Sequence, residues 1–450
     1  MANISHPQSS DPDFTRSPVP QSARMSRFGL TMAWWSVCSA MFWLVVSATL
    51  AIHYGTVNTL IGLGLSALCY SLINAVISRH AIRTGLSVGL FSQTLLGRSG
   101  AALATLIFFA TAIYYGVFEG SVIAVAIQGY FPSLTLNQAY LLVVLYSVPL
   151  VLGSVQRWLD KLNGVLLPFY LLGLAAAVLM TLNTYGYSHA WLELGPEGGA
   201  SADGWWRCFS YFMGVWILMM YTWDYARMGK EEDADYHARF NFGLPFYAFT
   251  FLVNGVVGIF LAASIPTDGP VTEVSVVLAL LKLMGFAGLA FVWVSQTRIN
   301  TANFYLATIN LQSCLEKGLG LRLPKLACGV LVGVVVYLLM LTNVFEFILQ
   351  ALAYQGIFVV AWVGLALSHI FFDPGTVRYG EQAPRFRSAG LGAWLAAAGL
   401  GIGCMIAGEQ WSNLSAPLSF VTAFGLYSVL NRRSARLASA AQSEADPASS

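Results

Sequence analysis

Long apolar segments, separated by short charged or Gly- and Pro-bearing turns, run through most of the chain. A helix that crosses the hydrocarbon core of a bilayer needs about 20 apolar residues, and dividing the chain at these turns predicts twelve spans. They cover residues 29–53, 57–78, 101–130, 138–155, 162–182, 205–223, 241–264, 284–312, 325–342, 344–371, 388–408 and 414–430. The runs lack the alternation of a membrane barrel, and lipid cannot satisfy open strand edges, so the spans are predicted to be helices of an all-α polytopic membrane protein.

The positions of the positive charges predict an orientation. All but three of the 23 Lys and Arg residues fall on one side of the twelve-span arrangement. Because positive residues accumulate on the cytoplasmic side, both termini are predicted to be cytoplasmic, in a plasma membrane such as the bacterial inner membrane. The exceptions are Arg207 at the outer end of the sixth span, Lys282 on an expected short outer helix, and Arg298 within the eighth span. A charge inside a span is costly, so Arg298 is a candidate functional residue.

Composition narrows the functional classes. Apolar types make up 57% of the chain and charged types only 10%, against about 25% charged in soluble proteins. The net charge of +2 offers no basic surface for nucleic acid. The six Cys form no C-x-x-C pair and the six His no H-x-x-x-H pair, so we expect no metal site, no cofactor and no enzyme centre. No required protein partner is evident; the expected surroundings are lipid.

The two ends of the chain differ from the apolar body. Residues 1–25 are polar and rich in Ser and Pro, and residues 433–450 are Ser and Ala with scattered charges. Both are predicted to be disordered cytoplasmic tails. The longest outer loop, 183–204, is too short for a folded domain. The function is therefore expected to lie within the membrane.

The third span carries an acidic and aromatic edge. Residues four apart share a helix face, so the pattern pairs Tyr115 with Glu119, Tyr114 with Phe118, and Gly116 with Gly120 in a strip for close packing. The tyrosines are also compatible with ordinary core packing. A carboxylate in mid-span pairs with a cation, becomes protonated, or does both during a cycle; a purely structural ion pair is the alternative.

The eighth and sixth spans carry further polar chemistry. Gln296, Asn300, Asn303 and Asn310 form one helical stripe, suited either to reading a flat heterocycle with C=O and N–H groups or to bonding neighbouring helices. Arg298 lies roughly 200° around the helix from Asn300. In the sixth span, Gly214 is a possible helix break before Trp216, and Asp224 with Arg227 forms a structural clamp or gate.

In their order along residues 26–430, these segments resemble nucleobase:cation symporter family 1, the permeases for purines, cytosine, uracil, allantoin and hydantoins. The resemblance rests on Arg83-Thr-Gly-Leu-Ser87, Leu96-Gly97-Arg98-Ser-Gly100, Tyr114-Tyr115-Gly116, Gly214 to Trp216, Asp224-Tyr-Ala-Arg227 and Asn300 to Asn303. It implies two inverted five-helix repeats, 26–182 and 205–372, each beginning with a discontinuous helix, followed by two appended helices in 373–432. The substrate site is expected beside the two breaks.

The resemblance also implies roles for the candidate residues. An aromatic of the third span, Tyr114 or Tyr115, and Trp216 of the sixth would enclose a flat ring, with Phe118, Glu119, Gly214 and Val215 beside it and Gln296, Asn300 and Asn303 reading its edge. Relatives that use sodium bind it with hydroxyls of the eighth span and carbonyls of the first, here Cys38 to Met41. In this chain Thr297-Arg298 stands there, and a guanidinium would replace the ion.

The sequence departs from the family at three points. Tyr114-Tyr115 stands where relatives usually have Trp, Phe118-Glu119 stands near a frequent Gln, and the first span has no Gly or Pro at its expected break. The function implied is secondary active import of a nucleobase or related planar nitrogen heterocycle by alternating access, coupled to H⁺ on Glu119 or to Na⁺. An importer of an amino acid, an amine or a vitamin on the same fold is the alternative.

Overall fold

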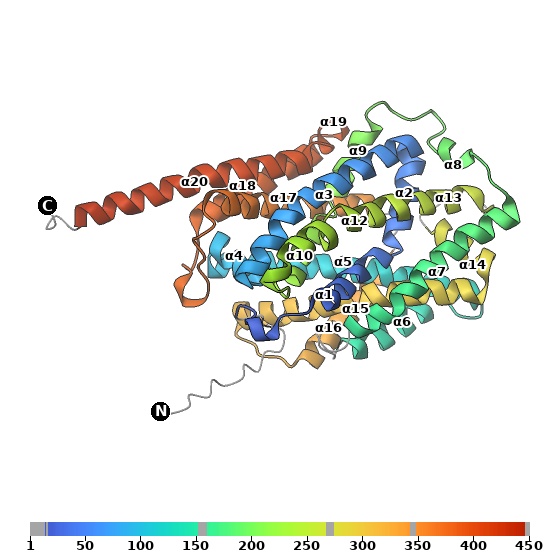
Figure 1. The fold of residues 1–450 in the computed structure, drawn as a ribbon, viewed down its shortest axis with the longest axis horizontal. Helices are drawn as coiled ribbons and strands as arrows, with labels where there is room; N and C mark the ends of the chain where they lie inside the picture. Colours follow the sequence, from blue (N-terminus) through green and yellow to red (C-terminus); the bar gives the residue numbers. More distant parts are fainter. Residues whose placement is uncertain (1–13, 15–16, 152–159, 267–273, 343–347, 446–450) are drawn as a thin grey trace.

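The computed structural model describes residues 14, 17–151, 160–266, 274–342 and 348–445, and their regular structure is helical (Figure 1). The first half contains η1 (Gln21–Ala23), α1 (Arg27–Trp34), η2 (Trp35–Ser39), α2 (Phe42–Tyr54), α3 (Thr56–Thr84), α4 (Val88–Leu96), α5 (Arg98–Tyr130), α6 (Leu136–Leu150), α7 (Asp160–Tyr185) and α8 (Ala190–Glu193).

The second half contains α9 (Gly204–Met213), α10 (Ile217–Ala226), η4 (Glu231–Asp233), α11 (Ala234–Tyr236), η5 (His237–Asn241), α12 (Leu244–Tyr247), η6 (Ala248–Val253), α13 (Asn254–Ser264), α14 (Ser275–Met284) and α15 (Phe286–Leu319). It ends with α16 (Lys325–Met340), α17 (Ile348–Phe372), η8 (Gly380–Gln382), α18 (Ser388–Ile406), α19 (Glu409–Ser412) and α20 (Ser415–Ala445).

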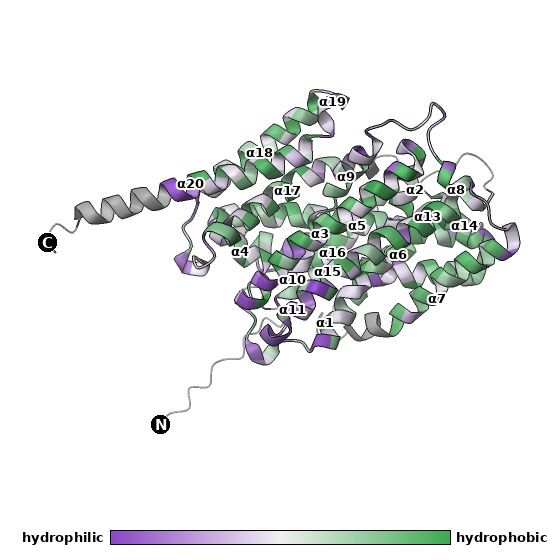
Figure 2. Ribbon diagram, turned by 45° about the horizontal axis from the view of Figure 1, so that its top comes forward, coloured by the Kyte–Doolittle hydropathy of each residue, from purple (hydrophilic) through white to green (hydrophobic). Residues whose placement is uncertain are grey.

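Each of the twelve predicted spans contains helix. Seven helical segments among the described residues are long and apolar enough to cross a membrane, and α6, α14 and α16 are shorter apolar helices. The count of twelve therefore stays a prediction, whereas the all-helical membrane fold is confirmed. Figure 2 shows apolar residues along most of the helices and hydrophilic residues gathered near α1, α10 and α11. Lys282 lies on the short helix α14, as expected; Arg16 and Arg157 lie outside the described residues.

Two helices are discontinuous, at the places where the resemblance puts the breaks. The first passes from α1 through the 3₁₀ turn η2 to Ala40, whose backbone is extended (φ −60°, ψ 128°), before α2 begins. The second stops at the end of α9 and resumes as α10, with residues 214–216 between them. Both breaks lie inside the helical body rather than at its surface.

Small residues bring the helices around these breaks close together. A Cβ on Gly116 of α5 would lie 3.6 Å from the ring of Phe304 on α15, and one on Gly120 would overlap Met340 of α16. The glycine strip predicted on the third span is therefore a helix contact. Gly258 of α13 likewise packs against the backbone of Leu44 on α2, where a Cβ would have no room.

The N-terminal segment corrects one prediction. Residues 17–25, here named the N-terminal strap, are packed against the protein rather than disordered: Val19 is 3% exposed, and its N–H donates to the carbonyl of Gly85 at 2.9 Å. The guanidinium of Arg24 donates to the carbonyls of Ile82 and, at 2.8 Å, Gly229. The composition of the segment does not predict this packing, because a few specific hydrogen bonds hold the strap in place.

The structure of the C-terminal segment corrects a second prediction, that of a disordered tail. Helix α20 continues to Ala445, so residues 433–445 are helical and not disordered. The segment 434-SARLASAAQSEA-445 is rich in Ala, the best helix former. This propensity allows α20 to extend past its apolar part.

The strap and the helix ends beside it define what we call the terminal face, which comprises residues 17–30, 79–98, 224–241 and 376–387. The opposite face contains Tyr54, Tyr130 and Gly204 at the other ends of α2, α5 and α9. In Figure 1 the helices run between these two faces, and the described chain begins and ends toward the first of them.

Candidate functional site

The first break is held open by side chains of distant helices. The N–H of Met41 donates to Oε1 of Gln296 on α15 at 2.7 Å, and Nδ2 of Asn254 on α13 donates to the carbonyl of Cys38 at 2.7 Å. The hydroxyl of Ser295 donates to the carbonyl of Ser39. These bonds satisfy backbone groups that lipid could not satisfy, so the break needs neither Gly nor Pro.

The second break is held by backbone packing. A Cβ on Gly356 of α17 would lie 2.5 Å from the Cα of Gly214, so only glycine fits there. The side-chain hydrogen bond at this break is long: the Nε2 group of Gln355 donates to the Gly214 carbonyl at 3.4 Å. The turn itself keeps short-range bonds, such as Leu218 N–H to the Val215 carbonyl at 3.0 Å. The close packing of α17 on Gly214 therefore determines the conformation of the second break.

A small cavity lies between the breaks, where α5, α10 and α15 meet them. Its volume is about 20 Å³, room for about one water molecule. It is lined by Val37, Ala40, Phe42, Trp43, Tyr115, Glu119, Val215, Ile217, Leu218, Tyr221, Ile299 and Asn303. We call this the central cavity. A flat ring enters it only if some of these side chains move.

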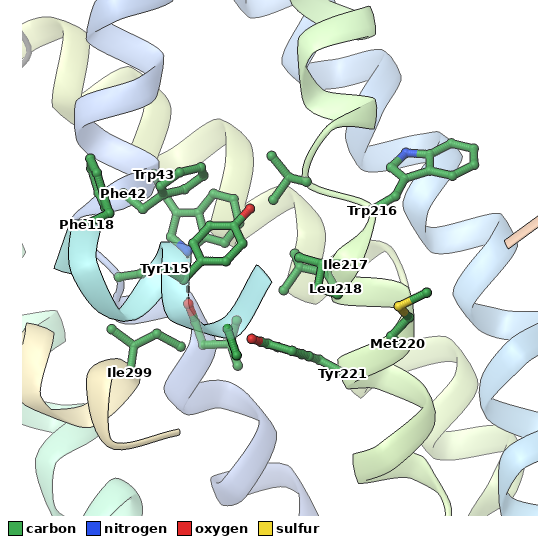
Figure 3. Close-up of a cluster of buried hydrophobic side chains, with 14 of the residues drawn as sticks. Phe42, Trp43, Tyr115, Phe118, Trp216, Ile217, Leu218, Met220, Tyr221 and Ile299 are labelled. Carbon is green, nitrogen blue, oxygen red and sulfur yellow. Dashed lines mark hydrogen bonds between the residues drawn. The ribbon is translucent and has the colours of Figure 1, made fainter. Parts of the chain in front are cut away.

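The structure brings four of the predicted substrate residues to the central cavity: Tyr115, Glu119, Val215 and Asn303. Figure 3 shows Tyr115 beside Phe42 and across the cavity from Tyr221. The rings of Phe42 and Tyr115 meet edge to face at 5.3 Å. This arrangement supplies aromatic surface from both broken helices and from α5.

Two other predicted aromatics of α5 lie behind this lining. Phe118 is fully buried against Phe42, with ring centroids 5.4 Å apart. Tyr114 is half-buried, and its ring lies 5.3 Å from that of Tyr115. Of the pair Tyr114 and Tyr115, Tyr115 is the one that lines the cavity.

Trp216 is not brought to the central cavity. Its ring packs against Tyr70 at 6.3 Å and Phe420 at 5.1 Å, and Figure 3 shows it pointing away from Tyr115. The reason is the phase of α10: Ile217 and Tyr221 are four residues apart and share the face that lines the cavity, while Trp216 precedes that helix. The sandwich of Tyr115 and Trp216 is thus absent from this conformation, and Tyr221 stands in that place.

The amides of α15 form a polar edge beside the cavity. Nε2 of Gln296 donates to Oε2 of Glu119, and Oδ1 of Asn303 accepts from the hydroxyl of Tyr221 at 3.3 Å. The Nδ2 group of Asn303 and both polar atoms of Asn300 are buried without a hydrogen-bond partner among the described residues. Leaving such groups unsatisfied costs about 1–3 kcal/mol each, which a ligand that bonds them would recover.

The residues predicted for ion coupling separate into two groups. Arg298 is fully buried, with Cys38 and Tyr170 among its titratable neighbours. The hydroxyl of Thr297 instead meets that of Tyr146 on α6 at 3.0 Å. Arg298 and Cys38 are therefore brought together at the first break, and Thr297 is directed elsewhere. The searched part of the chain contains no cluster of three or more His, Cys, Asp or Glu.

Several lining residues were missed by sequence reasoning. Phe42, Trp43 and Tyr221 are the most prominent, with Val37, Ala40, Ile217, Leu218 and Ile299 beside them. Phe42 and Trp43 directly follow the first break, and Trp43 is fixed by a bond from its indole N–H to the Val37 carbonyl at 2.9 Å (Figure 3). A search for aromatics immediately after the expected break would have found them.

A larger cavity opens on the opposite face. Its volume is about 360 Å³, and it is lined by His53, Tyr54, Ser210, Tyr211, Gly214, Gln350, Ala353, Met405, Ser412, Asn413, Ser415 and Ala416. We call this the outer cavity. Gly214 lines the outer cavity and its neighbour Val215 lines the central one. The second break is therefore the wall between them.

Solved structures of other transporters have a similar fold. Mhp1, a nucleobase-cation-symport-1 family transporter, in a closed conformation with bromovinylhydantoin bound, superposes with a TM-score of 0.75 at 14% identity, over 94% of this chain and 96% of that one. The inward-facing conformation of Mhp1 gives 0.75 at 13% identity, over 94% of both chains. The chain has the nucleobase-cation-symport-1 fold.

Other transporters share this fold more distantly. A manganese transporter of Eremococcus coleocola matches with a TM-score of 0.56 at 13% identity, over 93% of this chain and 96% of that one. A Na⁺-coupled sialic acid symporter matches at 0.52 and 10% identity, over 93% and 91%. No protein-family model and no curated protein matches the sequence. At these identities the likeness establishes the nucleobase-cation-symport-1 fold alone.

Proposed function

We propose that the protein is a secondary active transporter that imports a nucleobase or related planar nitrogen heterocycle by alternating access, coupled to protons. The observation that carries the proposal is the buried Nδ2 group of Asn303, which has no hydrogen-bond partner among the described residues and belongs to a residue that lines a cavity with Tyr115 and Glu119, where the two broken helices meet. Transporters of this architecture bind substrates beside such breaks.

A flat heterocycle suits the chemistry of the central cavity. Its ring faces would contact Tyr115 and the aromatics of the broken helices, and aromatic stacking is worth about 1–3 kcal/mol per base. Its N–H and C=O groups would bond Asn303 and Glu119, which a purely apolar solute would leave unsatisfied. Together these terms are enough for about micromolar binding.

The terminal face is proposed to be cytoplasmic. It carries Arg24, Arg27, Arg79 and Arg227 among its positive residues, as the positive-inside rule requires. The outer cavity would then admit substrate from outside the cell, which agrees with import. The host membrane would be a plasma membrane, such as the bacterial inner membrane.

The bonding of the first break favours protons over sodium. The carbonyls of Cys38 and Ser39 already accept bonds from Asn254 and Ser295, and Arg298 adds a positive charge beside Cys38. A sodium ion would have to displace these donors and sit near a guanidinium, which is unfavourable. Glu119 is the only carboxyl group that lines the central cavity.

Uptake by the purified protein in liposomes tests the proposal. The radiolabelled nucleobase or related heterocycle that enters should do so at the same rate when sodium is replaced by potassium, and a protonophore should abolish its accumulation. Asn303→Ala should lower uptake at least about tenfold, because a buried hydrogen bond to the substrate is lost. Asn310→Ala removes an amide of the same stripe that instead bonds its own helix at Leu306, and should transport normally.

The contrary results are equally specific. Normal uptake by Asn303→Ala would show that the proposed site is wrong. Strict sodium dependence would overturn the proton coupling but leave the substrate class standing. If no planar heterocycle enters the liposomes under any gradient, the proposed function itself fails.

A further inference from the structure

We propose that the coupled proton travels on the substrate: the site binds a planar heterocycle as its protonated cation, with Glu119 as the counter-charge. This inference rests on the proposed function and names its substrate class more narrowly. The expected ligands are weakly basic rings with a protonated ring nitrogen, such as aminopyridinium or aminopyrimidinium compounds. The first step of the argument concerns the state of Glu119.

Hydrogen bonding fixes Glu119 as an acceptor at one oxygen. A backbone N–H can only donate, so the N–H of Met41 requires that Gln296 turn its Oε1 toward the first break. The Nε2 group of Gln296 consequently faces Glu119 and donates to its Oε2. These two hydrogen bonds together determine which way the Gln296 amide is oriented. The bond to Glu119 is compatible with the negative form of the carboxyl group, whose oxygens only accept.

Among the described residues, no positive group lines the cavity beside this carboxylate. The residues that line the central cavity include no Lys, Arg or His, and no ion pair of Glu119 occurs among the described residues. Arg298, a buried cation in the same helix as Gln296, has the uncharged Cys38 and Tyr170 among its titratable neighbours and lies roughly 200° around the helix from Gln296. A buried carboxylate that lacks an internal partner requires a cation from elsewhere.

The rest of the lining suits an organic cation. Phe42, Trp43, Tyr115 and Tyr221 line the same cavity as Glu119, and Figure 3 shows the first three grouped on one side of it. The faces of aromatic rings attract cations, and this attraction grows when water is excluded. A protonated ring nitrogen would donate to Glu119 while the ring itself contacts these aromatics.

The charge balance of one cycle is simple. A neutral base gains a proton at its ring nitrogen outside, enters as a cation of charge +1, and loses that proton inside, while Glu119 keeps its charge of −1 throughout. No covalent bond other than this N–H bond forms or breaks. Transport of the cation is therefore equivalent to transport of one base and one proton.

The experiment compares 4-aminopyridine, which is protonated at pH 7, with 4-pyridone, an uncharged ring of the same size that also carries an N–H. Affinities are measured by titration calorimetry on the purified full-length protein. The wild-type chain should bind 4-aminopyridine at least about tenfold more tightly. Glu119→Asp, which keeps the charge, should keep the preference, and Glu119→Gln should abolish or reverse it. Glu381→Gln, a change of the same kind at an exposed position, should leave it intact.

The remaining outcomes distinguish the two proposals. Equal affinities, or a preference of the wild-type chain for 4-pyridone, would overturn the cation proposal and leave a neutral substrate with the proton on Glu119. Absence of binding of both pyridines, together with absence of nucleobase and hydantoin uptake, would refute the proposed function as well. Should Glu119→Gln fail to fold, the wild-type and Glu119→Asp measurements decide alone.

Discussion

The two faces of the molecule are built differently. The opposite face holds the outer cavity of about 360 Å³ and a second cavity of about 330 Å³ beneath the loop around Leu194. At the terminal face, a pocket of about 40 Å³ lies near Asp224 and Arg227. There Arg24 of the N-terminal strap donates to the carbonyls of Ile82 on α3 and of Gly229 after α10, and Arg27 of α1 donates to Asp233 of η4.

This difference indicates where the molecule would change during the proposed transport cycle. On the opposite face, the obstacle between the outer and central cavities is backbone packed on backbone at Gly214 and Gly356. On the terminal face, the obstacle is a set of exchangeable polar contacts centred on Arg24 and Arg27. The proposed alternating access would therefore require repacking at one face and breaking of polar bonds at the other.

The largest effect is expected for Gly356→Ala. The added Cβ would overlap the Cα of Gly214, and overpacking of this kind costs about 1–3 kcal/mol. Thermal unfolding should move to lower temperature, and uptake should fall more than about tenfold because the wall between the cavities is displaced. Gly399→Ala on α18 is the control, since nothing lies within 4 Å of a Cβ there. Equal behaviour of the two variants would show that the contact is unimportant.

A somewhat smaller effect is expected for Arg24→Ala. The guanidinium bonds the carbonyls of Ile82 and Gly229, and hydrogen bonds to charged groups contribute about 1.5–3 kcal/mol each. Without these bonds the strap should detach, and its detachment should expose the pocket near Asp224 and Arg227. The measurement is maleimide labelling of Ile309→Cys, which lines that pocket, in a chain whose native cysteines are replaced.

The labelling rate should rise about tenfold in Arg24→Ala. Arg83→Ala removes an exposed positive charge from the same face and should leave the rate unchanged. An unchanged rate in both variants would mean that the strap does not hold this face closed.

The smallest effects compare two ion pairs of the terminal face. Arg27 meets Asp233 at 2.5 Å, with the carboxylate only 7% exposed, whereas Arg79 meets Asp235 at 2.9 Å with both side chains largely exposed. Exposed pairs contribute about 0–1 kcal/mol and are screened by salt. In the same labelling assay, Asp233→Asn should raise the rate about threefold to tenfold and Asp235→Asn less than about twofold. Equal increases would remove the distinction between the pairs.

The fold was largely predictable because it depends on long apolar runs. The second break was predictable as well, since Gly214 marks it locally. The first break was suggested only by the resemblance, because the bonds that hold it come from Asn254, Ser295 and Gln296, more than 200 residues away. A local pattern cannot reveal such bonds.

The site was predictable only in part, for a related reason. The helical spacing of α5 and α15 placed Tyr115, Glu119 and Asn303 correctly on the faces that meet, because those helices are continuous. Trp216 and Tyr221 belong to a broken helix, whose phase after the break depends on how α10 packs. The packing of the strap was not predicted, because the amino-acid composition does not reveal the hydrogen bonds that Arg24 makes.

A structure of the protein with a bound heterocycle that competes for uptake tests the central claim most directly. We predict the ring in an enlarged central cavity, with its polar edge within hydrogen-bond distance of Asn303 and Glu119 and its face against Tyr115. A ring that sits instead among His53, Tyr211 and Asn413 of the outer cavity, with the central cavity unchanged, would contradict the account.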